Sequence, residues 1–331
     1  MSDTPLLEVK DLRTWFHTRD GLVKAVDGVS LEVYPGETLG LVGESGCGKS
    51  VTSLSLMQLI PTPGVIEEGS VISFDGRDVL SMNRKELEAM RGQKISMIFQ
   101  QPASALNPVV RIGAQISEVF EIHQGINREE GLEKAAEMLH RVGIPDVPQR
   151  IVAYPHEFSG GMAQRVMIAM ALACEPQLLI ADEPTTALDV TIQAQILDLM
   201  RDLKNNSKTA IILITHDLGV VAEMADRIAV MYAGQIVEQS TAVELFAEPK
   251  HPYTKGLIGS VPVLGVVKDA LTVIPGNVPN LVDLPTGCRF ADRCQARVDA
   301  KLTICTEQEP ELKDVGGGHL VRCWLYEDGA R

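Results

Sequence analysis

The stretch GESGCGKS, from Gly43 to Ser50, has the residue types and spacing of a phosphate-binding loop. Glycines let the backbone approach phosphate oxygens, and successive N–H groups at the start of a helix form an anion site. Lys49 would bring a positive charge to the β- and γ-phosphates, and the Ser50 hydroxyl could ligate Mg²⁺. We expect the nucleotide to contact Gly43, Ser45, Gly46, Cys47, Gly48, Lys49, Ser50 and Val51.

A pair of carboxylates ends the apolar run LLIAD, residues 178–182, where Glu183 follows Asp182 directly. At the end of a strand both side chains can reach one site. We expect Asp182 to belong to the Mg²⁺ shell and Glu183 to polarise the attacking water, a role that contributes about 10²–10⁴-fold to a rate. Two adjacent acids alone could be a solvated strand end, but downstream of a phosphate loop they predict hydrolysis of a nucleotide.

A third motif, EFSGGMAQRVMIAMALA, opens a long apolar helix with a Ser-Gly-Gly sequence. This is a second helix start suited to phosphate, and one nucleotide does not need two. The motif resembles the LSGGQ signature of ATP-binding cassette (ABC) ATPases, in which one subunit's signature closes over the ATP held by its partner. Phe158 replaces the first Leu and Met162 replaces the Gln. The central residues are intact: Ser159, Gly160 and Gly161.

The resemblance to ABC ATPases extends to single residues in the expected order between residues 6 and 240. Gln100 in MIFQQP matches the glutamine that senses Mg²⁺ and water and couples to the membrane domain. Asp189 in TALD matches the aspartate at the dimer interface, and His216 in LITHD matches the histidine at the γ-phosphate. Phe16 stands where the family places an aromatic ring on adenine, although a core position is the alternative for it.

The elements that must position these residues are visible as apolar runs and turn signals. From 103 to about 175 the pattern is mostly helical, and a hairpin turn is predicted at Ala233-Gly234. We expect strands at 6–16, 22–34, 38–43, 71–75, 94–99, 178–182 and 210–216 and helices at 49–60, 131–143 and 190–204. The resemblance implies an α/β fold, with a mixed sheet around the phosphate loop, an antiparallel β subdomain and a helical subdomain at about 103–175.

Composition limits the class of protein. The chain has 331 residues and a net charge of −14, which argues against wrapping nucleic acid. The start, MSDTPLLEVKDL, has no secretory signal pattern, and no apolar run reaches about 18 residues. We therefore expect a cytosolic protein. Proline-rich, aperiodic sequence begins near 248, so we expect a cassette domain over 1–247 and a loop-rich extension over 248–331.

The extension contains most of the cysteines, and thiols stay reduced in the cytosol, so a metal site is more expected than disulfides. Their spacing, C-x₅-C-x₁₀-C-x₁₇-C, lacks the short knuckle of most zinc sites and suits a larger iron–sulfur cluster. Zinc, or thiols without metal, are the alternatives. The four predicted ligands are Cys288, Cys294, Cys305 and Cys323. Arg289, Arg293 and Arg322 stand next to three of them and could offset cluster charge. No sequence feature ties the extension to the phosphate loop.

The stretches HPYTKGL, PGNVPNL and GCRFADRC, beginning at 251, 275 and 287, resemble the C-terminal region of oligopeptide/dipeptide importer ATPases. Some of these carry a [4Fe–4S] cluster there. The resemblance implies an ATPase that uses ATP and Mg²⁺ to power peptide import from the cytoplasmic face of the membrane, as a peripheral subunit. Its implied partners are a second ATPase subunit, either a copy or a paralogue, two transmembrane permeases and an external solute-binding protein. Alternatives are a nickel, glutathione or sugar cargo, or a soluble ABC ATPase of DNA repair or translation.

Overall fold

The computed structural model describes residues 4–186, 188–260 and 274–327. The chain folds into two compact units. The helical unit contains the residues up to Leu6, Val33–Thr38 and Ser81–Ile214, and the phosphate-loop unit contains Leu7–Glu32, Leu39–Leu80 and the residues from Thr215 onward. The predicted extension 248–331 lies in the phosphate-loop unit, and parts of it, 261–273 and 328–331, lie outside the described residues.

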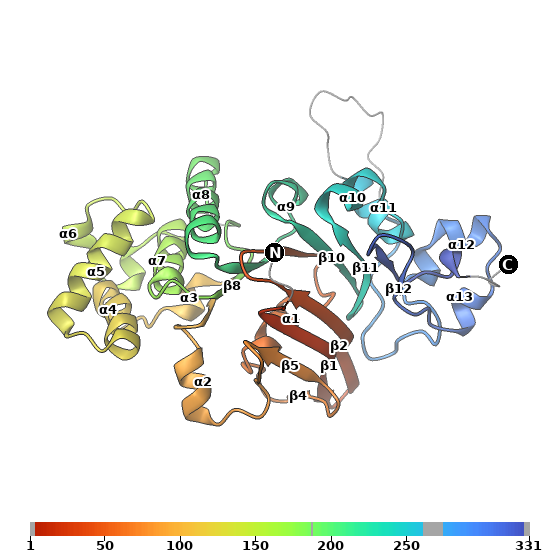
Figure 1. The fold of residues 1–331 in the computed structure, drawn as a ribbon, viewed down its shortest axis with the longest axis horizontal. Coiled ribbons are helices and arrows are strands. Elements are labelled where there is room, and N and C mark those ends of the chain that lie inside the picture. Colours follow the sequence, from red (N-terminus) through yellow and green to blue (C-terminus); the bar gives the residue numbers. More distant parts are fainter. Residues whose placement is uncertain (1–3, 187, 261–273, 328–331) are drawn as a thin grey trace. The chain divides into compact units, whose positions relative to one another are not determined.

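One sheet of the phosphate-loop unit is antiparallel and matches the predicted β subdomain (Figure 1). Strand β1 is the centre, because β4 and β5 both pair with it antiparallel, and β5 pairs with β6. The strand order is β2-β1-β5-β6, with β4 on β1. The strands are β1 (Leu7–Thr18), β2 (Gly21–Val33), β4 (Gly64–Ile66), β5 (Val71–Phe74) and β6 (Arg77–Asp78). Leu7, Val9 and Leu12 of β1 are buried, so the sheet packs its apolar side chains inward.

The remaining strands of this unit follow the order β12-β13-β11-β10-β3. Strands β10 and β3 are parallel, whereas β10 and β11 form the predicted hairpin, with Ala233 and Gly234 both at positive φ in its turn. The strands are β3 (Thr38–Val42), β10 (Arg227–Tyr232), β11 (Gln235–Thr241), β12 (Lys313–Asp314) and β13 (Leu320–Val321). The helices are α1 (Lys49–Leu56), α9 (Leu218–Met224), α10 (Ala242–Ala247), α11 (Pro252–Gly259), α12 (Gln295–Asp299) and α13 (Ile304–Glu307).

The helical unit contains three consecutive parallel neighbours, β7 (Ile95–Ile98), β8 (Leu178–Asp182) and β9 (Ala210–Ile214). All their residues are buried, as expected of parallel strands covered on both faces. Parallel neighbours need long crossovers, which the helices provide. The helices are α2 (Arg84–Met90), α3 (Pro102–Ala105), α4 (Ile112–Gln124), α5 (Arg128–Arg141), α6 (Val147–Arg150), α7 (Gly160–Leu172) and α8 (Val190–Ser207).

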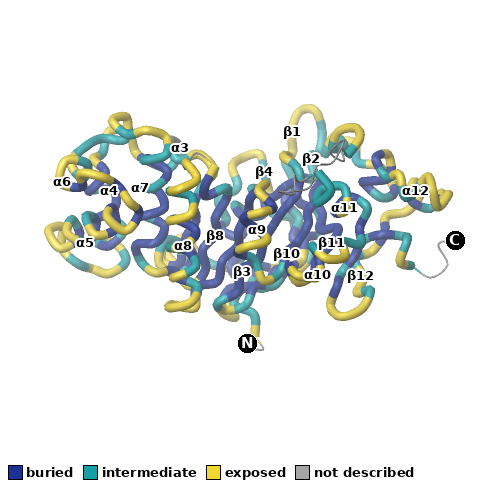
Figure 2. Tube along the Cα trace, turned by 90° about the horizontal axis from the view of Figure 1, so that it is seen from above, coloured by how far each residue is buried: buried dark blue, intermediate teal, exposed yellow. Residues whose placement is uncertain are grey.

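Strand β3 of the phosphate-loop unit and β7, β8 and β9 of the helical unit are entirely buried, whereas many exposed residues lie on helices and loops (Figure 2). Helix α5 is an example, because Ala135, Met138 and Leu139 are buried whereas its remaining side chains meet solvent. Such a narrow apolar stripe is the pattern of a helix that packs on one side only. No helix in the described ranges is long and apolar enough to cross a membrane.

The extension is joined to the sheet by strand pairing and by one buried carboxylate. Strand β13 pairs antiparallel with β11, with Val321 opposite Glu238. The side chain of Glu238 is fully buried and accepts hydrogen bonds from the N–H groups of Lys250 and His251, at 2.7 and 2.9 Å. Nε2 of His319 lies 2.7 Å from the same carboxylate. Glu238 therefore fixes both the entry to the extension and its returning strand.

Replacing Glu238 by Ala should leave two backbone N–H groups and His319 without their acceptor in a buried place. Each such loss costs about 1–3 kcal/mol, so we expect unfolding free energy to fall by about 3 kcal/mol or more. Urea denaturation followed by tryptophan fluorescence measures this, because Trp324 lies in the extension. Glu307→Ala, at an exposed position of α13, is the control and should change little. Equal denaturation midpoints for Glu238→Ala and wild type would contradict the role of Glu238.

Candidate functional site

The phosphate loop joins the buried strand β3 to helix α1, and its backbone admits only glycine at two positions. Gly43 has φ +153° and Gly48 has φ +107°. A Cβ at Gly43 would lie 2.1 Å from the carbonyl oxygen of Met231, and one at Gly48 would lie 2.2 Å from that of Ala25. By contrast, no atom lies within 4 Å of a Cβ at Gly46, which is exposed at the tip. The open side of the loop is therefore the side that a ligand can approach.

Lys49 is held inside this loop by backbone carbonyl groups. Its side chain is buried, and Nζ donates to the carbonyl oxygens of Gly43 and Glu44 at 2.8 and 3.0 Å. Helix α1 begins at Lys49, and its N-cap residue Gly48 provides no side-chain cap. The N–H groups of the first turn are thus available to phosphate oxygens, as an anion site at a helix start requires. Ser50 and Val51 in this turn are half-buried.

Cys47 has a structural position inside the loop. It is fully buried, and burial raises the pKa of its thiol above the usual value, so the thiol is neutral near pH 7. Its carbonyl oxygen accepts a hydrogen bond from the N–H of Gly234 at 2.9 Å. The turn between β10 and β11 therefore supports the end of the phosphate loop.

Phe16 is half-buried on β1. Side chains alternate along a strand, so Phe16 shares a face with Thr14. The Thr14 hydroxyl lies 2.7 Å from that of Ser55 on α1, which places this face toward the helix that follows the phosphate loop. Part of the Phe16 ring lies against Gly64, where a Cβ would come within 2.7 Å of it. Its role beside adenine stays a prediction.

The acidic pair lies at the carboxyl end of β8 in the helical unit. Asp182 is buried, with 3% of its surface exposed, and Glu183 is half-buried. Glu183 has φ +51°, and its N–H donates to the carbonyl oxygen of Ile214 at 2.8 Å. The Thr186 hydroxyl donates to Glu183 Oε2 at 3.0 Å. The turn out of the strand therefore points the two carboxylates differently, one toward the interior and one toward accessible space.

The Ser-Gly-Gly motif begins helix α7 as predicted. Ser159 is the N-cap, and its Oγ accepts from the N–H of Met162 at 3.3 Å. No atom lies within 4 Å of a Cβ at Gly160, so the helix start is open. One turn later, the buried Gln164 donates to the carbonyl oxygens of Glu183 and Pro184. The signature helix is thereby fixed to the acidic strand end, a contact that the sequence analysis missed.

The remaining predicted residues are exposed at strand ends or helix starts. Gln100 follows β7, whose Ile98 lies opposite Ala181 of β8, so Gln100 lies at the same edge as Asp182, the last residue of β8. Asp189 is the N-cap of α8 and accepts from the N–H of Ile192 at 3.0 Å. His216 follows β9 and is exposed. Within the helical unit, Gln100, Asp182 and Glu183 thus lie at the same edge of neighbouring strands.

The extension contacts the phosphate loop, although no sequence feature ties the two together. Arg293 makes two hydrogen bonds to the carboxylate of Glu44, at 2.7 and 3.0 Å. The Tyr253 hydroxyl accepts from the N–H of Glu44 at 2.8 Å. No motif points to these partners, because they lie 249 and 209 residues apart in the chain.

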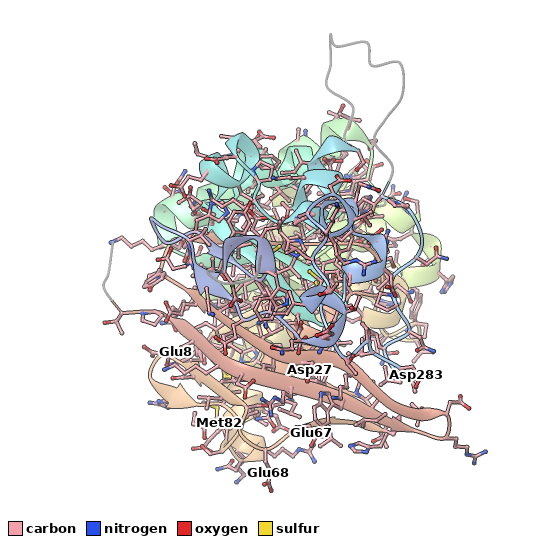
Figure 3. All side chains as sticks on the ribbon, turned by 90° about the vertical axis from the view of Figure 1, so that its right-hand side faces the viewer. Glu8, Asp27, Glu67, Glu68, Met82 and Asp283 are labelled. Atoms are coloured by element: carbon pink, nitrogen blue, oxygen red, sulfur yellow. The ribbon has the colours of Figure 1, made fainter. Side chains whose placement is uncertain are left out.

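The arginines beside the cysteines have partners outside the cavity, and their role in offsetting cluster charge stays a prediction. Arg293 is paired with Glu44, and Arg289 forms ion pairs with Asp27 of β2 and with Glu309. Asp27 lies midway along the antiparallel strands (Figure 3). Arg322 donates to the carbonyl oxygens of Ile236 and Pro310.

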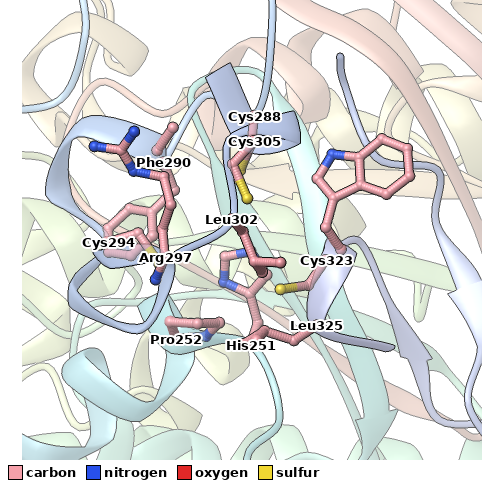
Figure 4. A pocket seen from close by; sticks show the side chains of 12 residues that line it. His251, Pro252, Cys288, Phe290, Cys294, Arg297, Leu302, Cys305, Cys323 and Leu325 are labelled. Atoms are coloured by element: carbon pink, nitrogen blue, oxygen red, sulfur yellow. The ribbon is translucent and has the colours of Figure 1, made fainter. Parts of the chain in front are cut away.

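The cysteines of the extension share one cavity. Cys288, Cys294, Cys305 and Cys323 all line it, together with His251 and Phe290 among others (Figure 4). Burial raises the pKa of Cys288 and that of Cys323 to about 12, and it also raises those of the other two thiols. In the ranges described, no group of three His, Cys, Asp or Glu side chains comes close enough to hold a metal ion. The thiols thus surround one space without gathering around a point.

Comparison with known proteins agrees with these features. The model of the ABC transporter family matches residues 26–186, and that of the oligopeptide/dipeptide transporter C-terminal region matches residues 237–300. The oligopeptide transport ATP-binding protein OppD of Bacillus subtilis is 52% identical over 99% of this chain and 90% of its own. The dipeptide transport ATP-binding protein DppD of the same organism is 49% identical over 98% of this chain and 96% of its own.

Two solved structures support the fold. The ATP-binding cassette MJ0796, a dimer in a post-hydrolysis state with ADP and Pi, has a TM-score of 0.64 at 26% identity. It covers 71% of this chain and 98% of that chain. A structure of the ATP-binding subunit of an ABC transporter has a TM-score of 0.60 at 25% identity, over 73% of this chain and 91% of that chain. The predicted ABC ATPase cassette fold is confirmed, and the chain belongs to the family of ATP-hydrolysing, ATP-binding subunits of ABC-type oligopeptide and dipeptide transporters.

Proposed function

We propose that this chain hydrolyses ATP to drive import of oligopeptides or dipeptides through partner membrane proteins. The observation that carries the peptide assignment is the similarity, over nearly the full chain, to relatives named for oligopeptide and dipeptide transport. Their sequences are 52% and 49% identical to this one. The match of the C-terminal region of such transporters over residues 237–300 supports it independently of the cassette.

In the proposed reaction the phosphate loop binds the ATP phosphates through backbone N–H groups, and Lys49 faces the β- and γ-phosphates. Ser50 and the buried Asp182 would hold Mg²⁺, which offsets phosphate charge; a hydroxyl and a carboxylate are oxygen donors that Mg²⁺ prefers. Glu183 orients and deprotonates the attacking water, and its accessible, hydrogen-bonded position fits this role. Gln100 at the same edge positions that water.

We propose that hydrolysis requires two cassettes. The chain has one phosphate loop and one Ser-Gly-Gly helix start. The open face at Gly160 would close over the ATP of a second subunit, with Ser159 and the helix start facing its γ-phosphate. Asp189 would lie at this interface and His216 at the γ-phosphate. The partner is a copy or a paralogue, and the dimeric cassette at 26% identity is consistent with this assembly.

We further propose a peripheral place on the cytoplasmic face of the membrane. Two transmembrane permeases would receive the closing motion, and an extracytoplasmic solute-binding protein would deliver the cargo.

For the cysteine cavity we propose a [4Fe–4S] cluster held by Cys288, Cys294, Cys305 and Cys323. The proposal is supported by the four thiols that line one cavity and by their sequence spacing, which lacks the short knuckle of most zinc sites. The raised thiol pKa values mean that ligation must displace protons, which makes assembly pH-dependent. The cluster would hold the irregular extension in shape.

The cargo can be tested in cells. A deletion strain is complemented with a plasmid that encodes this chain and its partner subunits. It should accumulate radiolabelled peptide with the wild-type chain but not with Lys49→Ala, because that substitution removes the charge that faces the phosphates. Matched uptake assays with nickel, glutathione and an oligosaccharide identify another cargo. Peptide uptake that is equal with the Lys49→Ala variant, or uptake of one of the other cargoes alone, would contradict peptide import.

The catalytic role of Glu183 predicts a separation of binding from hydrolysis. Glu183→Gln should retain ATP binding, whereas phosphate release in the assembled complex should fall by about 10²-fold or more, since the base is lost. Binding is measured with a fluorescent ATP analogue and hydrolysis by phosphate release. Glu137→Gln, on the exposed face of α5, is the control. Wild-type turnover by Glu183→Gln would show that another group activates the water.

The cysteine site predicts a colour. Protein purified without oxygen should be brown, with broad absorption near about 400 nm and iron and sulfide in similar amounts. Serine at any of the four extension cysteines should weaken or remove the absorption, whereas Cys174→Ser, outside the cavity, should retain it. Colourless protein with one zinc per chain, or without metal, would refute the cluster.

A further inference from the structure

Glu44, the second residue of the phosphate loop, is held at three points. Its carbonyl oxygen accepts from Lys49 Nζ at 3.0 Å, and its N–H donates to the Tyr253 hydroxyl at 2.8 Å. Its carboxylate receives the paired hydrogen bonds of Arg293. Two of these three partners come from the extension. A paired arginine–carboxylate contact fixes orientation as well as distance, so the start of the loop is fixed by residues far along the chain.

Arg293 itself is held in a buried setting. Only 7% of the residue is exposed, and its Nε donates to the carbonyl oxygen of Pro275 at 2.7 Å. The guanidinium lies over the rings of Tyr232 and Phe290, 5.7 and 5.9 Å from their centroids. An arginine packed in this way has little conformational freedom. The carboxylate of Glu44, which it bonds twice, is therefore also held in one position.

A second arginine of the extension, Arg289, supports the other end of the phosphate loop. Arg289 donates to the carbonyl oxygen of Ala233 at 2.7 Å, and it is 9% exposed. Gly234, the next residue, donates its N–H to the carbonyl oxygen of Cys47 at 2.9 Å. The extension therefore supports the loop near its beginning through Arg293 and near its end through Arg289.

Both arginines, Arg289 and Arg293, come from the short segment that lines the cysteine cavity. Arg289 follows Cys288, and Arg293 precedes Cys294. Between them Phe290 lines the cavity, and its ring lies 5.5 Å from Tyr253 and 5.3 Å from Tyr232. Side chains in contact thus connect the lining of the cavity with Glu44, through Phe290, Tyr253 and Arg293.

We infer that Arg293 is a positioning residue of the nucleotide site, through which the state of the cysteine cavity and the binding of ATP influence each other. The inference rests on the nucleotide site proposed above, and it holds whichever group the thiols ligate. By linkage, the influence is reciprocal. A well-packed cysteine cavity favours ATP binding, and bound ATP makes the cavity thiols less accessible to reagents in solution.

The charges of Glu44 and Arg293 indicate whether loss of Arg293 strengthens or weakens ATP binding. The carboxylate of Glu44 stands in a loop that must receive a polyanion, and Arg293 neutralises it. Without Arg293, a partly buried negative charge would face the phosphates and the loop would lose its anchor. Removing one partner of a buried pair is usually more harmful than removing both, because the remaining charge is left uncompensated. Loss of Arg293 should therefore weaken ATP binding, and neutralising Glu44 as well should restore part of it.

The first test measures the dissociation constant of a fluorescent ATP analogue for the full chain. Arg293→Gln should bind about tenfold more weakly or worse, and Arg293→Lys should show a smaller loss, because it keeps the charge without the paired geometry. Adding Glu44→Gln to Arg293→Gln should recover part of the affinity. Arg322→Gln is the matched control. It removes another mostly buried arginine of the extension, which bonds Ile236 and Pro310 and makes no contact with the loop, so its affinity should stay near the wild-type value.

The second test measures the reciprocal effect. Extension cysteines are alkylated in the presence of excess iron chelator, with and without ATP, and labelling of Cys288 and Cys294 is followed by peptide mass spectrometry, which separates them from Cys47. ATP should slow their labelling several-fold in wild type and in Arg322→Gln. The protection should be lost in Arg293→Gln, and also in Lys49→Ala, which cannot bind the nucleotide.

Wild-type affinity in Arg293→Gln, no recovery by Glu44→Gln, or equal labelling with and without ATP would each overturn the inference. An equal fall in melting temperature and in affinity for the Arg293 and Arg322 variants would also overturn it, because it would assign the loss to general unfolding. Failure of wild type itself to bind ATP would instead refute the proposed nucleotide site. Absence of iron, or a different cargo, would leave both measurements interpretable.

Discussion

The close approach of three backbone segments at the phosphate loop is the constraint on which the rest of the molecule depends. Gly43 and Gly48 leave room for the carbonyl groups of Met231 and Ala25 and for nothing larger. The loop therefore packs directly against the backbones of β2 and β10, and Gly234, in the turn after β10, donates its N–H to the carbonyl oxygen of Cys47. A local sequence motif thus specifies a conformation that only distant strands can enforce.

The local elements were predictable because their signals are short-range. The apolar run at 178–182 is buried on both faces and appears as β8 with those bounds, and Ile196 and Leu203 lie on the buried face of α8. Strands β6, β12 and β13 were not predicted, because two residues cannot display a period. Their positions depend on neighbours, as β13 shows by pairing with β11.

In the candidate site, too, some features follow from short-range sequence signals and others depend on residues far away in the chain. The phosphate loop, the acidic strand end and the capping role of Ser159 follow from residue types and spacing, whereas the partners of Arg289 and Arg293 do not. Adjacent cysteines suggested one electrostatic role for these arginines, but the carboxylates that pair with them come from β2 and from the phosphate loop. Ion pairs are chosen by three-dimensional proximity, and 262 residues separate Arg289 from Asp27.

The separation of 249 residues between Glu44 and Arg293 also has a consequence in time. Protein synthesis is vectorial, and at about 5–20 residues per second the ribosome needs roughly 12 to 50 seconds to pass from one residue to the other. During that interval the nascent chain has its phosphate loop without Arg293, and for the first 209 residues of it also without Tyr253. The contact between Arg293 and Glu44 can therefore form only late in synthesis, and a translation product that stops before Arg293 lacks it.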